Sequence, residues 1–283
     1  MKVLLAVLLA TAPTPGPGQS LDPAQSQATG RAVLETGHVD IGPRLRDGKW
    51  TIQIHDDHAV PAVWREPADT VLRVRDTAGQ RVPDDPAYAF LGEPPGTAVH
   101  VVPQTEKPGV IWIGWNTQDP GVLGAVGRGV TMSLRGVRGP GNVTVFLQSG
   151  NLGAPQVLWS STKPMPQPIW VETNTHTHAN WVFGRPGTYL LAVDISADLA
   201  GGSTATASTV LRLAVGDVTE PDFDGTVALP TAAGPETPTT SSGTWEKPAL
   251  IGSAALALLI VVLLVARQSA ARRRAERDHE AAR

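Results

Sequence analysis

Two histidines stand two residues apart in the segment WVETNTHTHANWVFGRPGTYLLAV, residues 170–193. Alternate residues of a β-strand project from the same face, so the Cα atoms of His176 and His178 are expected about 7 Å apart. Both imidazoles can then reach one metal ion. Neutral imidazole suits Zn²⁺, and also Mn²⁺ or Fe²⁺ when carboxylates join the ligands. The spacing therefore predicts two ligands of a metal site.

Further clusters of histidine and aspartate lie upstream, in the sequences GHVDIG and IHDDHAV. The chain has seven histidines, and five of them fall in these two clusters and the pair above. We predict His38, His176 and His178 as first-choice metal ligands. The second-choice candidates are Asp40, His55, Asp57 and His58. Whether the three clusters meet in space stays open at this stage.

The same residue types allow other interpretations. A histidine pair on a surface can simply be solvated, and the isolated His100 is expected to be structural. Core positions are expected for Trp112, Trp115, Trp170 and Trp181, with an aromatic face for sugar rings as the alternative. Haem capture through histidine is a weaker alternative, because no Tyr–His haem pattern is evident.

Composition excludes several classes of chemistry. The chain has no cysteine, so disulfides, thiolate metal sites and cysteine nucleophiles are ruled out. Its net charge is -3, which gives no indication of nucleic acid as a partner. The sequence shows no nucleophile elbow, no phosphate-binding glycine loop and no HExxH motif. We therefore expect a protein that is not an enzyme.

The elements that must position the histidines are predicted to be β-strands. Runs rich in Val, Ile, Thr and Trp recur between Gly and Pro turn signals, without sustained helical periodicity. They are KWTIQIH, TVLRVRD, GVIWIGWN, GVTMSLRGV, GNVTVFLQS, PIWVETN, GTYLLAVDISADLA and STATASTVLRLAV. The predicted fold class is all-β, an immunoglobulin-like β-sandwich followed by a single C-terminal transmembrane helix.

A glycine-rich break near residues 116–129 suggests a division of the ectodomain. We predict an N-terminal β unit over 31–120 packed on an immunoglobulin-like sandwich over 128–216, with one larger sandwich as the alternative. The sequence PGTY places Tyr189 at a strand start, which resembles the tyrosine corner of such folds.

Both ends of the chain carry targeting signals. Residues 1–26 are predicted to be a signal peptide and a disordered N-terminus. The Pro/Thr-rich segment 217–248 is expected to be an extended stalk. Residues 249–266 are uncharged and apolar, as in a membrane-spanning helix, and the basic tail 267–283 follows. The positive-inside rule then predicts a single-pass cell-membrane protein with its ectodomain outside and its tail in the cytoplasm.

Three stretches together resemble a known family. VETNTHTHANWVF with the following PGTY, GHVDIG, and VPQTEKPGVIWIGWNTQ are similar to the actinobacterial surface-anchored repeat associated with ABC transporters, described as choice-of-anchor M domain proteins. The resemblance covers roughly residues 32–215. It implies a cell-surface protein anchored to wall or membrane. It also implies, as partners, a metal-type transporter's substrate-binding lipoprotein and permease, but supplies no ligand assignments.

The sequence thus predicts a membrane-anchored binding protein. It would capture or buffer a divalent metal ion in support of an ABC-type importer, with Zn²⁺ as the first expectation and Mn²⁺ as the second. The alternative is an adhesion or interaction module without metal, which binds cell-wall polymer or a partner protein.

Overall fold

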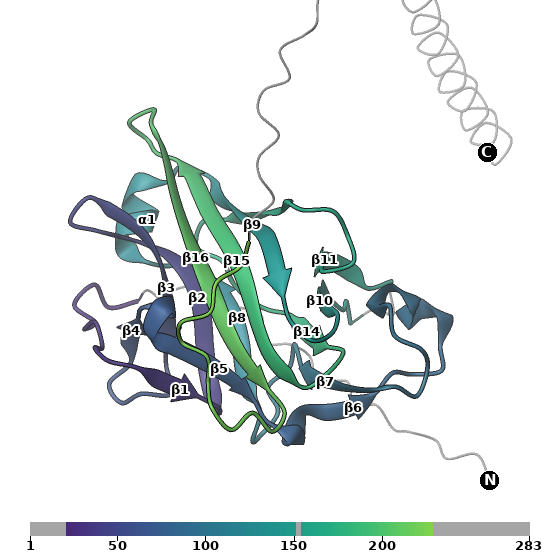
Figure 1. Ribbon diagram of the computed structural model, residues 1–283. Helices are drawn as coiled ribbons and strands as arrows, with labels where there is room; N and C mark the ends of the chain where they lie inside the picture. The colour runs from purple at the N-terminus through teal and green to yellow at the C-terminus, as the bar shows by residue number, and fades with distance from the viewer. Residues whose placement is uncertain (1–20, 151–153, 229–283) are drawn as a thin grey trace, which may run out of the picture. The chain divides into compact units, whose positions relative to one another are not determined.

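The computed structural model describes residues 21–150 and 154–228, which form an all-β fold (Figure 1). These residues belong to one compact unit. Among them, no helix has the length and apolar character needed to cross a bilayer. The predicted signal sequence within residues 1–20, the helix at 249–266 and the tail at 267–283 lie outside the described residues, as does most of the stalk.

Sixteen strands are described, and they pair into three sheets. The six-stranded sheet has the order β1 (Ala32–Leu34), β5 (Thr70–Val74), β16 (Thr204–Val215), β15 (Gly187–Asp198), β9 (Gly129–Arg138) and β12 (Gln167–Glu172). A second sheet has the order β11 (Gln156–Ser160), β10 (Val143–Leu147), β14 (Asn180–Phe183), β7 (Ala98–Val102) and β6 (Gly79–Arg81).

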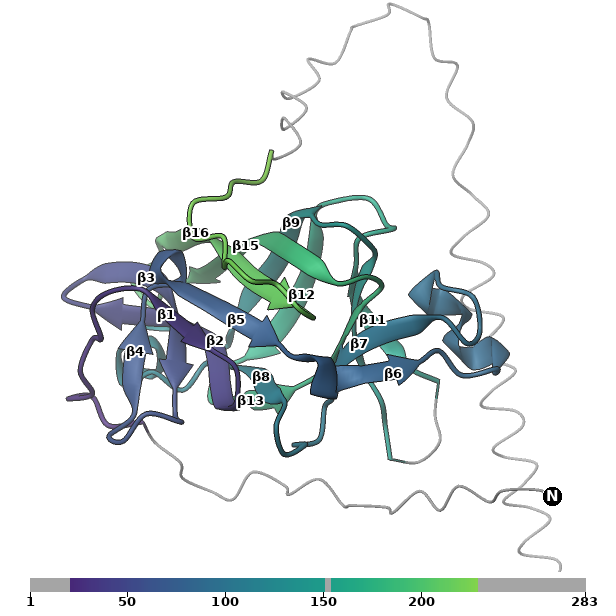
Figure 2. The same ribbon diagram turned by 60° about the horizontal axis from the view of Figure 1, so that its bottom comes forward.

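The third sheet carries the histidines. Its order is β13 (His176–His178), β8 (Ile111–Asn116), β2 (Gly37–Arg46), β3 (Lys49–Asp56) and β4 (Val63–Arg65). Short helices connect the strands: η1 (Pro67–Asp69), η2 (Asp76–Ala78), η3 (Pro86–Leu91) and α1 (Pro120–Ala125). The second and third sheets lie toward opposite ends of the six-stranded sheet (Figure 2).

The third sheet has one apolar face and one polar face, because side chains alternate along each strand. On the apolar face Val39 and Ile41 of β2 lie beside Ile54 of β3 and Ile113 of β8, all at most 2% exposed. They belong to a core cluster with contributions from all three sheets. The long β15–β16 hairpin lies across this sheet (Figure 1), and Trp50 Nε1 donates a hydrogen bond to its Ile195 O at 3.0 Å.

All eight predicted runs contain strands, so the all-β prediction is confirmed. The break at 116–129 contains α1, and hydrogen-bonded strand pairs cross it: β5 with β16, β7 with β14, and β8 with β13. This pairing favours the larger single β unit over two units. The immunoglobulin-like topology of 128–216 stays a prediction.

The disordered N-terminus predicted up to residue 26 is wrong for its last residues. The carbonyl of Ser26 accepts a hydrogen bond from the Trp64 amide at 3.0 Å, and Gln27 forms a β-bridge with Trp64. Gln25 bonds the buried ring of His55. Backbone pairing and the side chain of Gln25 thus attach this segment to the third sheet, and an apolar pattern could not have shown it.

The tryptophans divide into two kinds. Trp115 and Trp181 are buried, as predicted. Trp170 is 56% exposed, so its predicted core position is wrong: it lies on the edge strand β12 with its side chain on the outer face. Trp112 is partly buried and stacks on a histidine instead of filling the core.

The predicted tyrosine corner is present. Tyr189 Oη donates to the carbonyl of Arg185 at 2.7 Å and accepts from the Arg185 amide at 3.2 Å. Because the ring is fully buried, Tyr189→Phe should remove these bonds without opening a cavity. We expect the free energy of unfolding to fall by about 1 kcal/mol. Urea denaturation should show a lower midpoint with an unchanged slope, and an unchanged midpoint would contradict the prediction.

Candidate metal centre

Strand pairing places residues of four strands in one row across the third sheet. His178 of β13 lies opposite Gly114 of β8, Gly114 lies beside Asp40 of β2, and Asp40 lies opposite His55 of β3. Directly paired residues project from the same face of a sheet. His176 and His38 stand two residues from His178 and Asp40, so they share this polar face.

Three imidazole nitrogens meet above this row. The Nε2 atom of His38 lies 3.0 Å from that of His176 and 3.0 Å from that of His178, and the last two are 3.1 Å apart. An imidazole nitrogen either carries a proton or offers a lone pair. Among three nitrogens that all contact one another, at least two must therefore be in the same state. Those two place either two protons or two lone pairs against each other, which is repulsive. One cation bound by all three lone pairs resolves that conflict.

A buried carboxylate closes the group. Asp40 Oδ2 lies 3.1 Å from His176 Nε2, and Oδ1 lies 3.4 Å from His38 Nε2. Asn116 Nδ2 donates to Oδ2 at 3.1 Å, whereas Oδ1 has no hydrogen-bond partner among the described residues. Burial alone would raise the pKa of Asp40, but His176 and His38 outweigh it and hold this pKa well below its usual range. The carboxylate is thus ionised and available to a cation.

Neighbouring side chains fix the orientation of the imidazoles. Asp57 Oδ2 accepts a hydrogen bond from His38 Nδ1 at 2.7 Å, which directs Nε2 toward the centre. The ring of Trp112 stacks on that of His178, with centroids 3.7 Å apart and planes 11° apart. A carboxylate that orients a ligating histidine is a recurrent feature of metal sites.

The histidines differ in protonation. Burial would lower the pKa of His38, but hydrogen bonds and charge from Asp40 and Asp57 outweigh it and raise the pKa to about 10. Burial lowers the pKa of His178 to about 4, and the charges of His38 and His176 add to this effect. At neutral pH without metal, His38 therefore carries a proton and His178 offers a lone pair.

A glycine keeps the centre open. A Cβ atom at Gly114 would clash with Asp40 Oδ1 and would lie 2.7 Å from His178 Cε1 and 2.8 Å from the Thr177 carbonyl. Any other residue would therefore fill the space between Asp40 and His178. Gly114, Asn116 and Gln25 also belong to this region, although none of them was predicted. A glycine inside the strand WIGWN was the available signal, since such glycines mark close approaches.

Of the remaining predicted ligands, two lie in a second group of possible metal ligands and one does not. Together with Asp40, His55 and Asp57 form an adjacent group that could also hold a metal ion. Burial lowers the pKa of His55, and this effect outweighs the opposite effect of the nearby carboxylates of Asp57 and Asp40. His58 belongs to neither group: its ring packs on Gly37, where a Cβ would lie 2.5 Å from the imidazole. His100 pairs with Asp76 at 3.0 Å, away from both groups.

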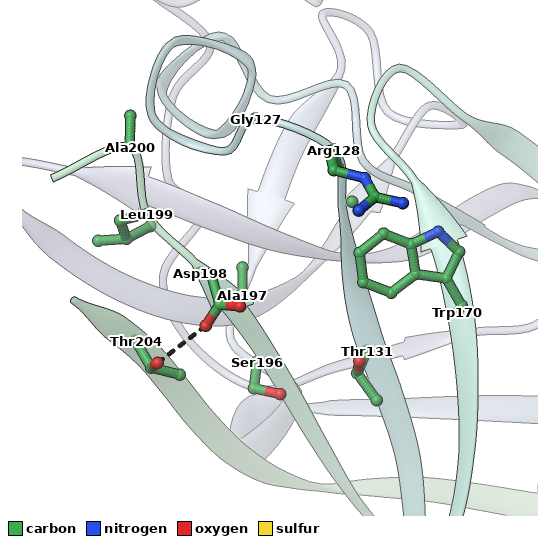
Figure 3. Close-up of a pocket in the computed structure, with 11 residues that line it drawn as sticks. Gly127, Arg128, Thr131, Trp170, Ser196, Ala197, Asp198, Leu199, Ala200 and Thr204 are labelled. Atoms are coloured by element: carbon green, nitrogen blue, oxygen red, sulfur yellow. Dashed lines mark hydrogen bonds between the residues drawn. The ribbon is translucent and has the colours of Figure 1, made fainter. Parts of the chain in front are cut away.

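A shallow hollow of about 330 Å³ opens on the six-stranded sheet (Figure 3). The exposed indole of Trp170 stands at one side beside Arg128, and Asp198, bonded to Thr204 at 2.9 Å, stands at the other. Thr131 and Ser196 lie between them. This surface combines a flat aromatic face with polar groups.

Comparisons with family models, curated proteins and solved structures gave no match to the chain. The resemblance to the surface-anchored repeat therefore stays a prediction.

Proposed function

We propose that this protein binds a divalent transition-metal ion reversibly through His38, Asp40, His176 and His178. The observation that carries the proposal is the mutual 3.0–3.1 Å contact of three imidazole nitrogens beside a buried carboxylate. A set of three imidazoles and one carboxylate suits Zn²⁺ first and Mn²⁺ second.

The burial of the ligands supports capture and exchange. The side chains of Asp40 and His178 are 3% and 8% exposed, whereas those of His38 and His176 are 19% and 22% exposed. An ion can thus approach from the side of His38 and His176 and settle against Asp40. A structural metal site is usually fully enclosed, whereas this one is open to solvent on one side.

We further propose that the protein presents this site outside the cell membrane and supplies metal to an ABC-type importer. The support is the sequence alone: the expected anchor at 249–266 and the family resemblance of residues 32–215. Cells lacking the protein should take up less Zn²⁺ when it is scarce. Uptake should be restored by the wild-type chain and by His100→Ala, but not by His176→Ala/His178→Ala. Equal uptake in all four strains would refute this role.

Metal binding should release protons. Since His38 is protonated below a pKa of about 10, the incoming ion must displace its proton at pH 7, and about one proton should leave per ion bound. Apparent affinity should therefore rise about tenfold per pH unit between pH 7 and 9. Calorimetry in buffers of different ionisation enthalpy measures this number. Absence of proton release at pH 7 would show that His38 is not a ligand.

The hollow beside Trp170 favours a second candidate function, the binding of a wall polysaccharide. The exposed indole offers a flat apolar surface to a sugar ring, and Thr131, Ser196 and Asp198 offer hydrogen bonds to its hydroxyls. The chain should then bind purified cell wall equally well with and without chelator. Trp170→Ala should abolish that binding, and unchanged binding would exclude this surface.

A further inference from the structure

We propose a second cation position, held by His55, Asp57 and Asp40, so that the Asp40 carboxylate is shared between two ions. The inference rests on the proposed function, because the first ion occupies the other side of Asp40. It adds a distinct feature: a carboxylate-bridged pair of metal ions in place of one.

The ring of His55 is set for a ligand on its inner nitrogen. Gln25 Oε1 lies 2.8 Å from His55 Nε2, so Nε2 carries the hydrogen and donates it. Nδ1 therefore offers a lone pair. This atom is buried, and no hydrogen-bond partner reaches it among the described residues. His55 itself is 1% exposed.

That lone pair faces an oxygen that also needs a partner. Asp57 Oδ1 lies 3.1 Å from His55 Nδ1, and two electron-rich atoms at this distance repel unless a cation lies between them. The other oxygen of Asp57 is already bound by His38 Nδ1 at 2.7 Å. Asp57 thus links the two positions: one oxygen orients a ligand of the first ion, and the other faces the second position.

Asp40 completes the set. It lies directly opposite His55 in the β2–β3 register, is 2% exposed, and its Oδ1 is unpaired within the described residues. One ligand atom each from Asp40, His55 and Asp57 fall within 4.8 Å of one another. Asn116 Nδ2 donates to Oδ2, so Oδ1 is the buried oxygen without a hydrogen bond, which is costly. A bound cation satisfies it.

The charges around Asp40 and Asp57 also favour a bound cation. Within the described part of the chain, no lysine or arginine lies within ion-pair distance of Asp40 or Asp57, and the basic side chains that contact them are histidines. Their neighbour Asp56 differs, since Arg65 Nε binds it at 2.8 Å. Arginine thus neutralises the adjacent carboxylate, whereas Asp40 and Asp57 share the single positive charge of protonated His38. Two oxygens and one nitrogen make this position weaker for Zn²⁺ than the first.

The experiment is calorimetric titration of the purified 283-residue chain in mild detergent with Zn²⁺ alone. Wild type should bind two equivalents, one tight and one weaker. His55→Gln should lose the weaker step, by at least about 100-fold in affinity, and keep the tight step. His176→Ala/His178→Ala should lose the tight step. One equivalent in both wild type and His55→Gln overturns the second position and leaves the proposed function standing, whereas no binding by wild type overturns both.

A measurement on wild type alone guards against a misfolded variant. With two equivalents of Mn²⁺, electron paramagnetic resonance should show an exchange-coupled pair, because a shared carboxylate holds the ions close together. With one equivalent, the spectrum should be that of an isolated ion. A spectrum of isolated ions at two equivalents would overturn the bridged pair.

Discussion

Replacing His176 and His178 together with alanine is expected to weaken Zn²⁺ binding at the tight step by at least about 1,000-fold, or about 4 kcal/mol. The change removes two of the three nitrogen donors that meet at 3.0–3.1 Å. Only His38 and Asp40 then remain at the site, and this ion pair is expected to keep the proton of His38 in preference to binding a metal ion. Calorimetry with a competing chelator measures the loss.

The matched control is His100→Ala. His100 is also a histidine paired with an aspartate, at 3.0 Å from Asp76, but it lies outside both candidate metal groups. Its loss should leave Zn²⁺ affinity within about threefold of wild type, since distant sites act independently. If the double variant binds as tightly as this control, the two central histidines are not ligands.

Gly114→Ala should strongly weaken tight metal binding without removing any ligand. The added methyl group would clash with Asp40 Oδ1 and press on His178 and the backbone of Thr177. Backbone on one side and a buried carboxylate on the other leave little room for adjustment. We expect affinity to fall by at least about 100-fold and the free energy of unfolding to fall by about 1–3 kcal/mol. Titration and urea denaturation measure the two effects separately.

Gly124→Ala provides the comparison for this variant. Gly124 lies in α1, and a Cβ there would meet nothing within 4 Å. Alanine in a helix is favoured over glycine by up to about 1 kcal/mol, so stability should hold or rise and metal binding should not change. Normal Zn²⁺ affinity in Gly114→Ala would mean that the centre lies elsewhere.

Alternation of apolar and polar residues predicted the strands that form most of the fold. It did not predict β2: the run GHVDIGPRLR alternates Val39, Ile41 and Leu45 with other residues, but it carries a proline, which is uncommon inside a strand. That strand supplies His38 and Asp40.

The spacing of the histidines predicted three ligands of the site, but it did not predict which carboxylate lies at the centre. His176 and His178 do share one face, and His38 does join them, as their type and periodicity suggested. Asp40 emerges as the central carboxylate, although it was a second choice. Its role follows from the parallel pairing of β2 with β8, a contact between residues more than seventy positions apart. No local pattern encodes such a pairing.

His58 shows that closeness in sequence to a ligand does not by itself predict a ligand. It stands one residue after Asp57, yet its ring packs on Gly37 and belongs to neither group. His55 lies in β3, and Asp57 keeps its alternation one residue past the strand end, with its amide bonded to the His38 carbonyl at 3.2 Å. His58 lies in the bend that follows. Gln25 could not be predicted, because it joins the site from the segment preceding β1 through a single amide contact.

The most direct test of the central claim is the anomalous scattering of crystals of this protein grown with Zn²⁺. We expect a strong peak at the zinc edge, about 2.0–2.2 Å from the Nε2 atoms of His38, His176 and His178 and from one carboxylate oxygen of Asp40. A protein saturated with Zn²⁺ whose peak lies elsewhere, with the three imidazoles still in mutual contact and unligated, would contradict it.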